Sequence, residues 1–193
     1  MKKSVLLVLA IFSTSIAINA QGFSGGVKGG INLATSSYSN ANMRVGINAG
    51  VLGQFKFPVS DFAFQFEILY SAQGDKGTDE GITATAATDY INIPFLLQYY
   101  AAPNFYLEFG PHIGFLTSAK AKFSEGGVSA SVDIKEYCNA VDYGLNFGAA
   151  YELPAIPLGF FARYTLGLTN IVKDEGNSGN NHRVIQLGAF YKF

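Results

Sequence analysis

Few side chains in the 193-residue chain have the chemistry of acid–base or nucleophilic catalysis: two histidines, His112 and His182, and one cysteine, Cys138. Hydrolysis by a serine nucleophile requires a Ser, a His and an acid close together. Neither histidine has an obvious serine and acid beside it. We expect His112 to be a satisfied polar residue inside a strand and His182 to border a loop and face solvent. Cys138 has no partner for an internal disulfide and is interpreted as an incidental loop-edge residue.

The acidic residues do not form a metal-binding motif. One group lies near a polar stretch and another lies further along the chain: Asp75, Asp79, Glu80 and Asp89, then Asp174 and Glu175. Neither group has the spacing of a calcium-binding loop, and no glycine-rich phosphate loop is present. We therefore predict solvated acidic loops with no metal and no cofactor. A net charge near −1 offers no electrostatic basis for binding nucleic acid.

Four other charged residues share a regular placement: Lys28, Glu67, Glu108 and Arg163. Each lies four to six residues after the start of an alternating stretch, on the less apolar face. If these stretches run in the same direction, the four side chains fall at one depth. Because an unpaired buried charge is costly, two acids and two bases at one depth predict a neutral ionic network.

The elements that carry these residues are predicted to be β-strands. In residues 183–193, apolar side chains occupy every second position, which is the period of a strand with one apolar face. The same alternation recurs in eight stretches: 23–33, 44–57, 62–71, 89–100, 105–118, 139–151, 158–169 and 183–193. Pro94 and Pro111 interrupt two of them and predict a shared bulge or weak patch.

The connections between the eight stretches alternate between long and short. The long ones cover 34–43, 73–87, 119–137 and 170–181, and three short turns lie between them. This asymmetry is typical of bacterial outer-membrane barrels, with short periplasmic turns and long external loops. The sequence therefore predicts an all-β fold, an eight-stranded antiparallel up-and-down transmembrane β-barrel whose ring-bearing face contacts lipid. A soluble lipocalin-like barrel, with the apolar face inside, is the alternative architecture.

The N-terminus agrees with export. Lys2 and Lys3 precede an apolar run, and Ile18-Asn19-Ala20 is an acceptable cleavage site. These are the parts of a secretory signal peptide. We expect residues 1–20 to be that signal peptide and residues 21–193 to be the outer-membrane β-barrel domain.

Several segments resemble a known family: DYINIPFLLQYY (89–100), FYLEFGPHIGFLTSAK (105–120), VDYGLNFGAAYEL (141–153), FFARYTLGLTNI (160–171) and NHRVIQLGAFYKF (181–193). They are similar to the PorT-like outer-membrane β-barrel family of Gram-negative bacteria. The resemblance implies a signal peptide, a short barrel, variable external loops and membership of a group that often carries the porin label. Some relatives in that family are linked to protein secretion.

The function expected from these observations is that of a non-enzymatic integral outer-membrane protein. Its lumen would be plugged by side chains, and its four external loops would bind a ligand or support the envelope. The alternatives are a narrow porin-like channel for small solutes, an accessory component of a secretion system, or a lipid-modifying barrel enzyme. The expected partners are the outer-membrane bilayer and the barrel assembly machinery, which would engage the strand ending at Phe193.

Overall fold

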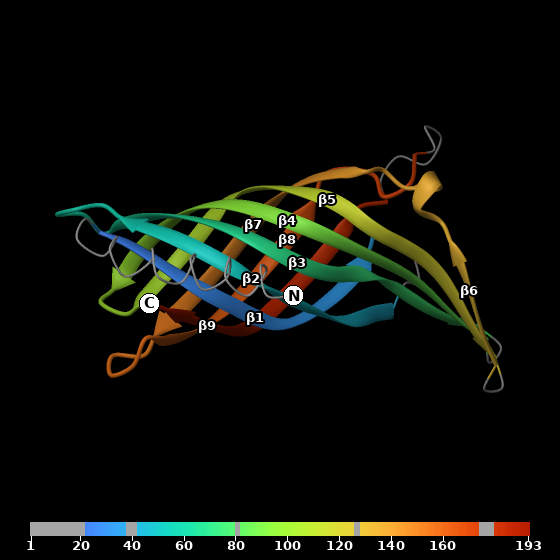
Figure 1. Cartoon of the computed structure of the whole chain (residues 1–193), viewed down its shortest axis with the longest axis horizontal. Helices are drawn as coiled ribbons and strands as arrows, with labels where there is room; N and C mark the ends of the chain where they lie inside the picture. The colour runs from blue at the N-terminus through green and yellow to red at the C-terminus, as the bar shows by residue number, and fades with distance from the viewer. Residues whose placement is uncertain (1–21, 38–41, 80–81, 126–127, 174–179) are drawn as a thin grey trace, which may run out of the picture.

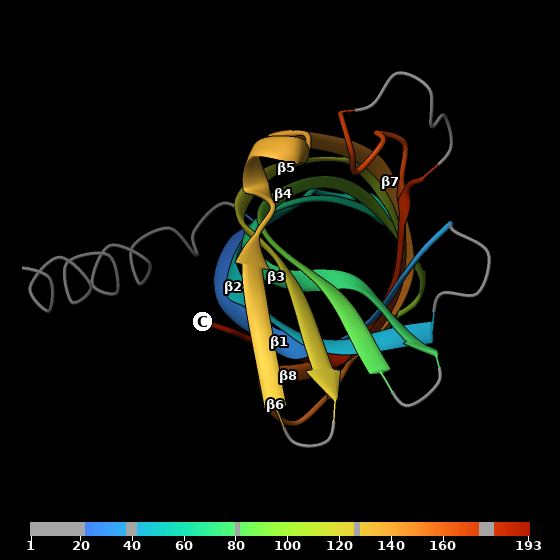
Figure 2. The same cartoon turned by 90° about the vertical axis from the view of Figure 1, so that its right-hand side faces the viewer.

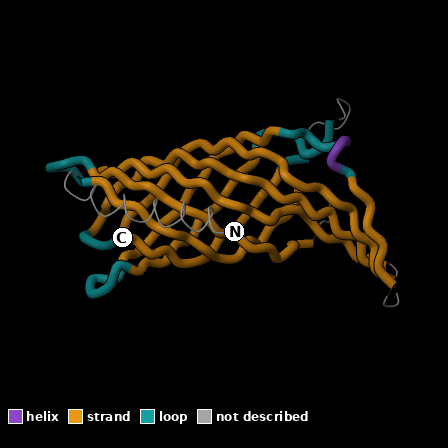
Figure 3. Tube along the Cα trace, viewed as in Figure 1, coloured by secondary structure: helices purple, strands orange, loops and turns teal. Residues whose placement is uncertain are grey.

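The computed structural model describes residues 22–37, 42–79, 82–125, 128–173 and 180–193. Nearly all of this part of the chain is β-strand, with one short 3₁₀ helix (Figure 3). The elements are β1 (Phe23–Ser36), β2 (Asn42–Lys56), β3 (Phe62–Asp79), β4 (Ile82–Ala102), β5 (Phe105–Glu125), β6 (Val128–Asp133), η2 (Lys135–Tyr137), β7 (Val141–Glu152), β8 (Leu158–Gly167) and β9 (His182–Lys192). The predicted signal peptide, residues 1–20, lies outside the described residues.

In the described part of the chain, eight strands form a closed antiparallel barrel. Each strand pairs with the next along the chain, with β5 followed by β7, and β9 closes the ring against β1 (Figures 1 and 2). The closing ladder runs from Gly26 opposite Lys192 to Ser36 opposite His182. The predicted eight-stranded up-and-down barrel is therefore confirmed. No helix among the described residues has the length and apolar character needed to cross a membrane.

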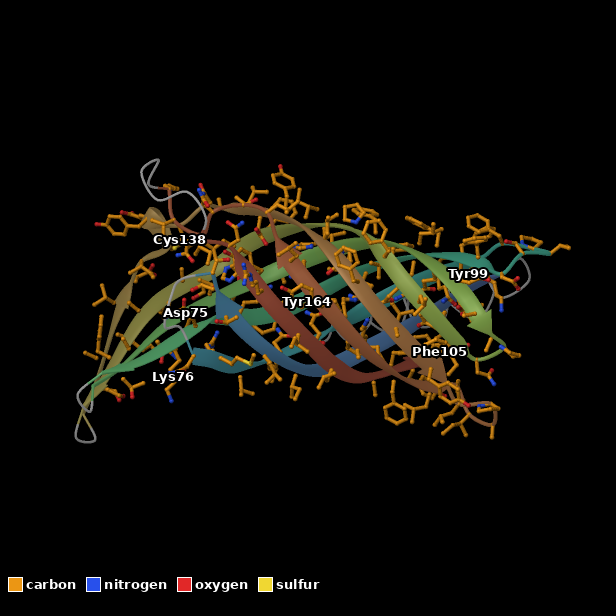
Figure 4. All side chains as sticks on the ribbon, turned by 180° about the vertical axis from the view of Figure 1, so that it is seen from behind. Asp75, Lys76, Tyr99, Phe105, Cys138 and Tyr164 are labelled. Atoms are coloured by element: carbon orange, nitrogen blue, oxygen red, sulfur yellow. The ribbon has the colours of Figure 1, made fainter. Side chains whose placement is uncertain are left out.

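The apolar and polar faces of the strands lie where the alternation predicted. In β3, Phe64, Phe66 and Ile68 are exposed on the outside, whereas Gln65 and Glu67 are buried inside. This is the reverse of a lipocalin-like barrel, which would hold its rings around a dry core. Tyr99 and Phe105 lie at the end of the barrel that carries the short turns (Figure 4).

The prediction of two of the long loops is wrong. Residues 73–87 and 119–137 do not form long loops, because β3, β4 and β5 continue far beyond the barrel and β6 pairs with the end of β5. Figure 1 shows this extension projecting from one end of the barrel, and we call residues 75–79, 82–86, 118–125 and 128–133 the projecting sheet. Outside a membrane neither face must be apolar, so the strands continue without the hydrophobic alternation that identified them elsewhere.

The two prolines do not produce a bulge. Pro94 pairs with His112 and Leu97 pairs with Phe109 in the same register. Between these two pairs the β4–β5 ladder leaves out Phe95 and Leu96 of β4 and Gly110 and Pro111 of β5. The register shifts of this hairpin lie elsewhere, one of them between Asp89 and Tyr90. The expectation of a weak patch agrees with the gap in the ladder, and that of a bulge at the prolines is wrong.

Candidate functional site: the barrel lumen

The four predicted ionic residues come together inside the lumen. They arise from β1, β3, β5 and β8, which stand a quarter of the ring apart in the strand order. Arg163 contacts Glu67 through two hydrogen bonds of 2.7 and 2.8 Å and contacts Glu108 at 2.7 Å. Lys28 donates to Glu67 at 3.0 Å. Each of the four residues is at most 5% exposed.

Charge and geometry together explain why this layer is stable. Two acids balance two bases, and each acid accepts from a cation. Paired, hydrogen-bonded charges can be buried at far lower cost than isolated ones. Lys28 also lies 3.7 Å above the centre of the Phe161 ring, a position that favours a cation. We call Lys28, Glu67, Glu108 and Arg163 the ionic layer.

An apolar cluster closes the lumen between the ionic layer and the short turns. Buried side chains from seven strands pack together there: Leu52, Ala63, Tyr100, Tyr106, Ala150, Phe161 and Phe190. Nearer the mouth, Lys192 contacts Glu152 at 2.5 Å, and Glu152 also accepts from the Tyr100 hydroxyl at 3.0 Å. Lys56 is exposed, with its ammonium 4.0 Å from the centre of the Tyr100 ring.

On the side of the ionic layer away from the short turns, the lumen is polar and contains both histidines. His112 is buried, as expected, and its Nε2 lies 3.4 Å from Asp142. The prediction that His182 faces solvent is wrong: it is 1% exposed, and its Nε2 lies 3.3 Å from the Tyr90 hydroxyl. His182 begins β9 and has the parity of Val184 and Gln186, both buried, so the strand period turns it inward.

A second cluster covers the lumen at the projecting-sheet end. Tyr90, Leu116, Ala119 and Cys138 pack together, with Ile134 and Ile171 against them. Cys138 therefore packs as a small apolar side chain in the segment between η2 and β7, more deeply than a loop-edge residue would. Burial raises the pKa of the Cys138 thiol, so the thiol stays protonated at neutral pH.

The acidic and histidine side chains of the described residues are not grouped as metal ligands. No group of three or more His, Cys, Asp or Glu side chains among them is placed to hold a metal ion. The Ser36 hydroxyl, which lies opposite His182 in the β1–β9 ladder, donates to the Asp75 carboxylate. Glu80, Asp174 and Glu175 lie outside the described residues.

Comparison with known proteins gives the same architecture. Residues 19–173 match the family model described as "Outer membrane protein beta-barrel domain". The chain is similar in structure to Neisserial surface protein A, with 13% identity, a TM-score of 0.50, and coverage of 89% of this chain and 97% of that one. It is also similar to Ail, the attachment invasion locus protein of Yersinia pestis, solved with the heparin analogue sucrose octasulfate, with 17% identity, a TM-score of 0.45 and the same coverage. No curated protein matches the chain.

Proposed function

Because the chain belongs to the family of outer membrane protein beta-barrel domains, we propose that it is a non-conducting, non-enzymatic barrel of the outer membrane. It acts through the strands and loops that it displays outside the cell. Its lumen serves as a rigid, side-chain-filled support for that display and carries no solute.

The observation that carries this proposal is the contact between Arg163 and Glu67. In the ring of eight strands, β8 and β3 lie opposite each other, four strands apart in either direction. The two side chains nevertheless touch at 2.7 Å, so they span the full width of the lumen. Glu108 and Lys28 come from the other pair of opposite strands and fill the remaining sides of the layer.

The orientation we propose follows the usual design of such barrels, with short turns on the periplasmic side and longer segments outside. The three short connections lie at one end of the barrel, and the projecting sheet lies at the other (Figure 1). The projecting sheet is then external. The outer-membrane bilayer is the proposed partner of the ring-bearing face, and the assembly machinery is the proposed partner of β9 and Phe193.

Conductance measurements in planar bilayers test this function. We expect the full-length mature protein to show no steady conductance. A double variant, Glu67→Ala with Arg163→Ala, removes the bridge while keeping the lumen neutral, and it should show small open events. The control is Lys135→Ala with Glu136→Ala, an exposed pair outside the barrel. Steady conductance of the unaltered protein would refute the sealed lumen and favour the narrow-channel alternative.

A further inference from the structure

The outer face of the projecting sheet carries a row of basic side chains. Lys76 of β3 pairs with Thr85 of β4, and Thr85 pairs with Lys122 of β5. Directly opposed residues of antiparallel strands place their side chains on the same face. Lys120 lies two residues from Lys122 and shares that face. Three lysines from two strands therefore stand together on one side of the sheet.

An arginine of β2 lines the same place. Arg44 stands beside the register shift of the β2–β3 ladder, which falls between Met43 and Asn48. The Arg44 guanidinium donates to the backbone carbonyl of Gln73, which holds it in position. A groove of about 550 Å³ results, which we call the basic groove and define by Met43, Arg44, Val45, Lys76, Thr85 and Lys122.

The three cations of the basic groove, Arg44, Lys76 and Lys122, form no ion pair within the described part of the chain. Asp75, next to Lys76 in sequence, points the other way and accepts from Ser36. Three cations from three strands around one cavity form a site for an anion with several oxygens, such as a phosphate.

The apolar wall of the groove indicates that the phosphate belongs to a lipid and not to a free anion. Val45 and Met43 are 67% and 56% exposed, which is unusual for apolar side chains beside a polar sheet. Val45 continues the exposed apolar row that Ile47 and Val51 form along β2 on the lipid-facing surface. The groove therefore adjoins the part of the barrel that acyl chains cover, and a ligand in it meets cations and apolar surface together.

We propose that the basic groove binds the phosphate headgroup of a phosphorylated lipid in the outer leaflet, with the hydrocarbon of that lipid against Met43 and Val45. Arg44 supplies a planar, fixed donor, and Lys76 and Lys122 supply point charges on either side. Basic pockets at a membrane surface bind anionic headgroups by this combination. The proposal concerns the outside of the barrel and does not depend on whether the lumen conducts.

The first test measures binding of bis-phosphorylated lipid A to the full-length mature protein in phosphatidylcholine nanodiscs, by native mass spectrometry. Arg44→Gln, Lys76→Gln and Lys122→Gln each remove one charge, and each should weaken binding by about tenfold. Lys135→Gln and Lys173→Gln are matched controls, because both lysines are exposed at the same end of the barrel but lie outside the groove. Equal binding by groove variants and controls would overturn the site.

The second test separates a lipid from a soluble anion. Dephosphorylated lipid A should bind at least about tenfold more weakly, because the charge-assisted contacts are lost. Val45→Asn should weaken lipid A binding but leave the binding of inorganic phosphate or heparin by the detergent-solubilised protein unchanged. If heparin binds more tightly than lipid A, and Val45→Asn has no effect on lipid A, the groove serves a soluble polyanion and the lipid proposal is wrong.

Discussion

At the scale of single residues, the balance of charge in the ionic layer decides whether the barrel is stable. Glu67 is fully buried and accepts from both Arg163 and Lys28. Glu67→Gln keeps the shape of the side chain but leaves the layer with one excess positive charge. Because unpairing a buried charge is costly, we expect a loss of about 3–5 kcal/mol in the free energy of unfolding. Urea titration of the refolded protein, followed by its heat-dependent gel mobility, measures this loss.

Restoring neutrality is the control for that prediction. Lys28→Met in the Glu67→Gln background removes the unpaired ammonium and should recover most of the stability. Glu136→Gln, at an exposed site outside the barrel, should change it little. If the double variant is as unstable as Glu67→Gln alone, hydrogen bonding and not charge balance holds the layer together.

Neighbouring residues of one strand offer a test of which face meets lipid. Phe66 is 40% exposed on the outside of β3, and Gln65 is 1% exposed inside. Phe66→Arg places a charge among acyl chains and should cost about 2–4 kcal/mol near the middle of the bilayer. Gln65→Arg enters a polar lumen and should be milder. Refolding into lipid vesicles compares the two, and equal tolerance would contradict the face assignment.

Comparing the predicted and observed positions of particular residues shows what strand alternation can and cannot predict. Strand alternation placed Glu67 and Arg163 inside, because one face of each strand had to be apolar. It failed for His182, whose inward position depends on where β9 begins. It also missed Arg44, since an alternation pattern does not reveal which side chains gather around the basic groove.

At the scale of elements, strands inside and outside the membrane obey different rules. The barrel portions were predictable because lipid requires an apolar outer face. The extensions of β4 and β5 alternate alanine with threonine or lysine. Their pairing is decided by the hairpin ladder itself. Composition alone therefore suggested loops where the chain continues as paired strands.

Truncation of the projecting sheet tests this division. β6 pairs only with β5 among the described strands, whereas the β5–β7 ladder of the barrel begins at Phe115 opposite Val141. Replacing residues 121–132 with two glycines between Lys120 and Asp133 should leave the heat-dependent gel shift intact and alter unfolding by less than about 1 kcal/mol. Extending the deletion to Ala119 should destabilise the barrel, since Ala119 packs against Tyr90 and Leu116. Loss of folding in the shorter deletion would show that the extension belongs to the barrel's own folding unit.

At the scale of the whole molecule, the barrel depends on the seam between its first and last strands. Gly30 of β1 lies directly opposite Gly188 of β9, and Gly188 also pairs with Phe161 of β8. A Cβ on Gly188 would come too close to the backbone of Gly29 and would meet the Phe161 ring at 2.8 Å. The glycine therefore permits the close approach on which ring closure depends.

Gly188→Val should accordingly weaken closure as a whole, by about 1–3 kcal/mol or more, because overpacking forces strands apart. Ala189→Val is the matched control: it changes the next residue of the same seam, which has the opposite parity and faces outward with Leu187 and Tyr191. The fraction of each variant that refolds in detergent, together with its urea midpoint, gives the comparison. If Gly188→Val refolds as well as Ala189→Val, the seam can open to admit a side chain, and the barrel is held closed by the ionic layer rather than by tight contact between β1 and β9.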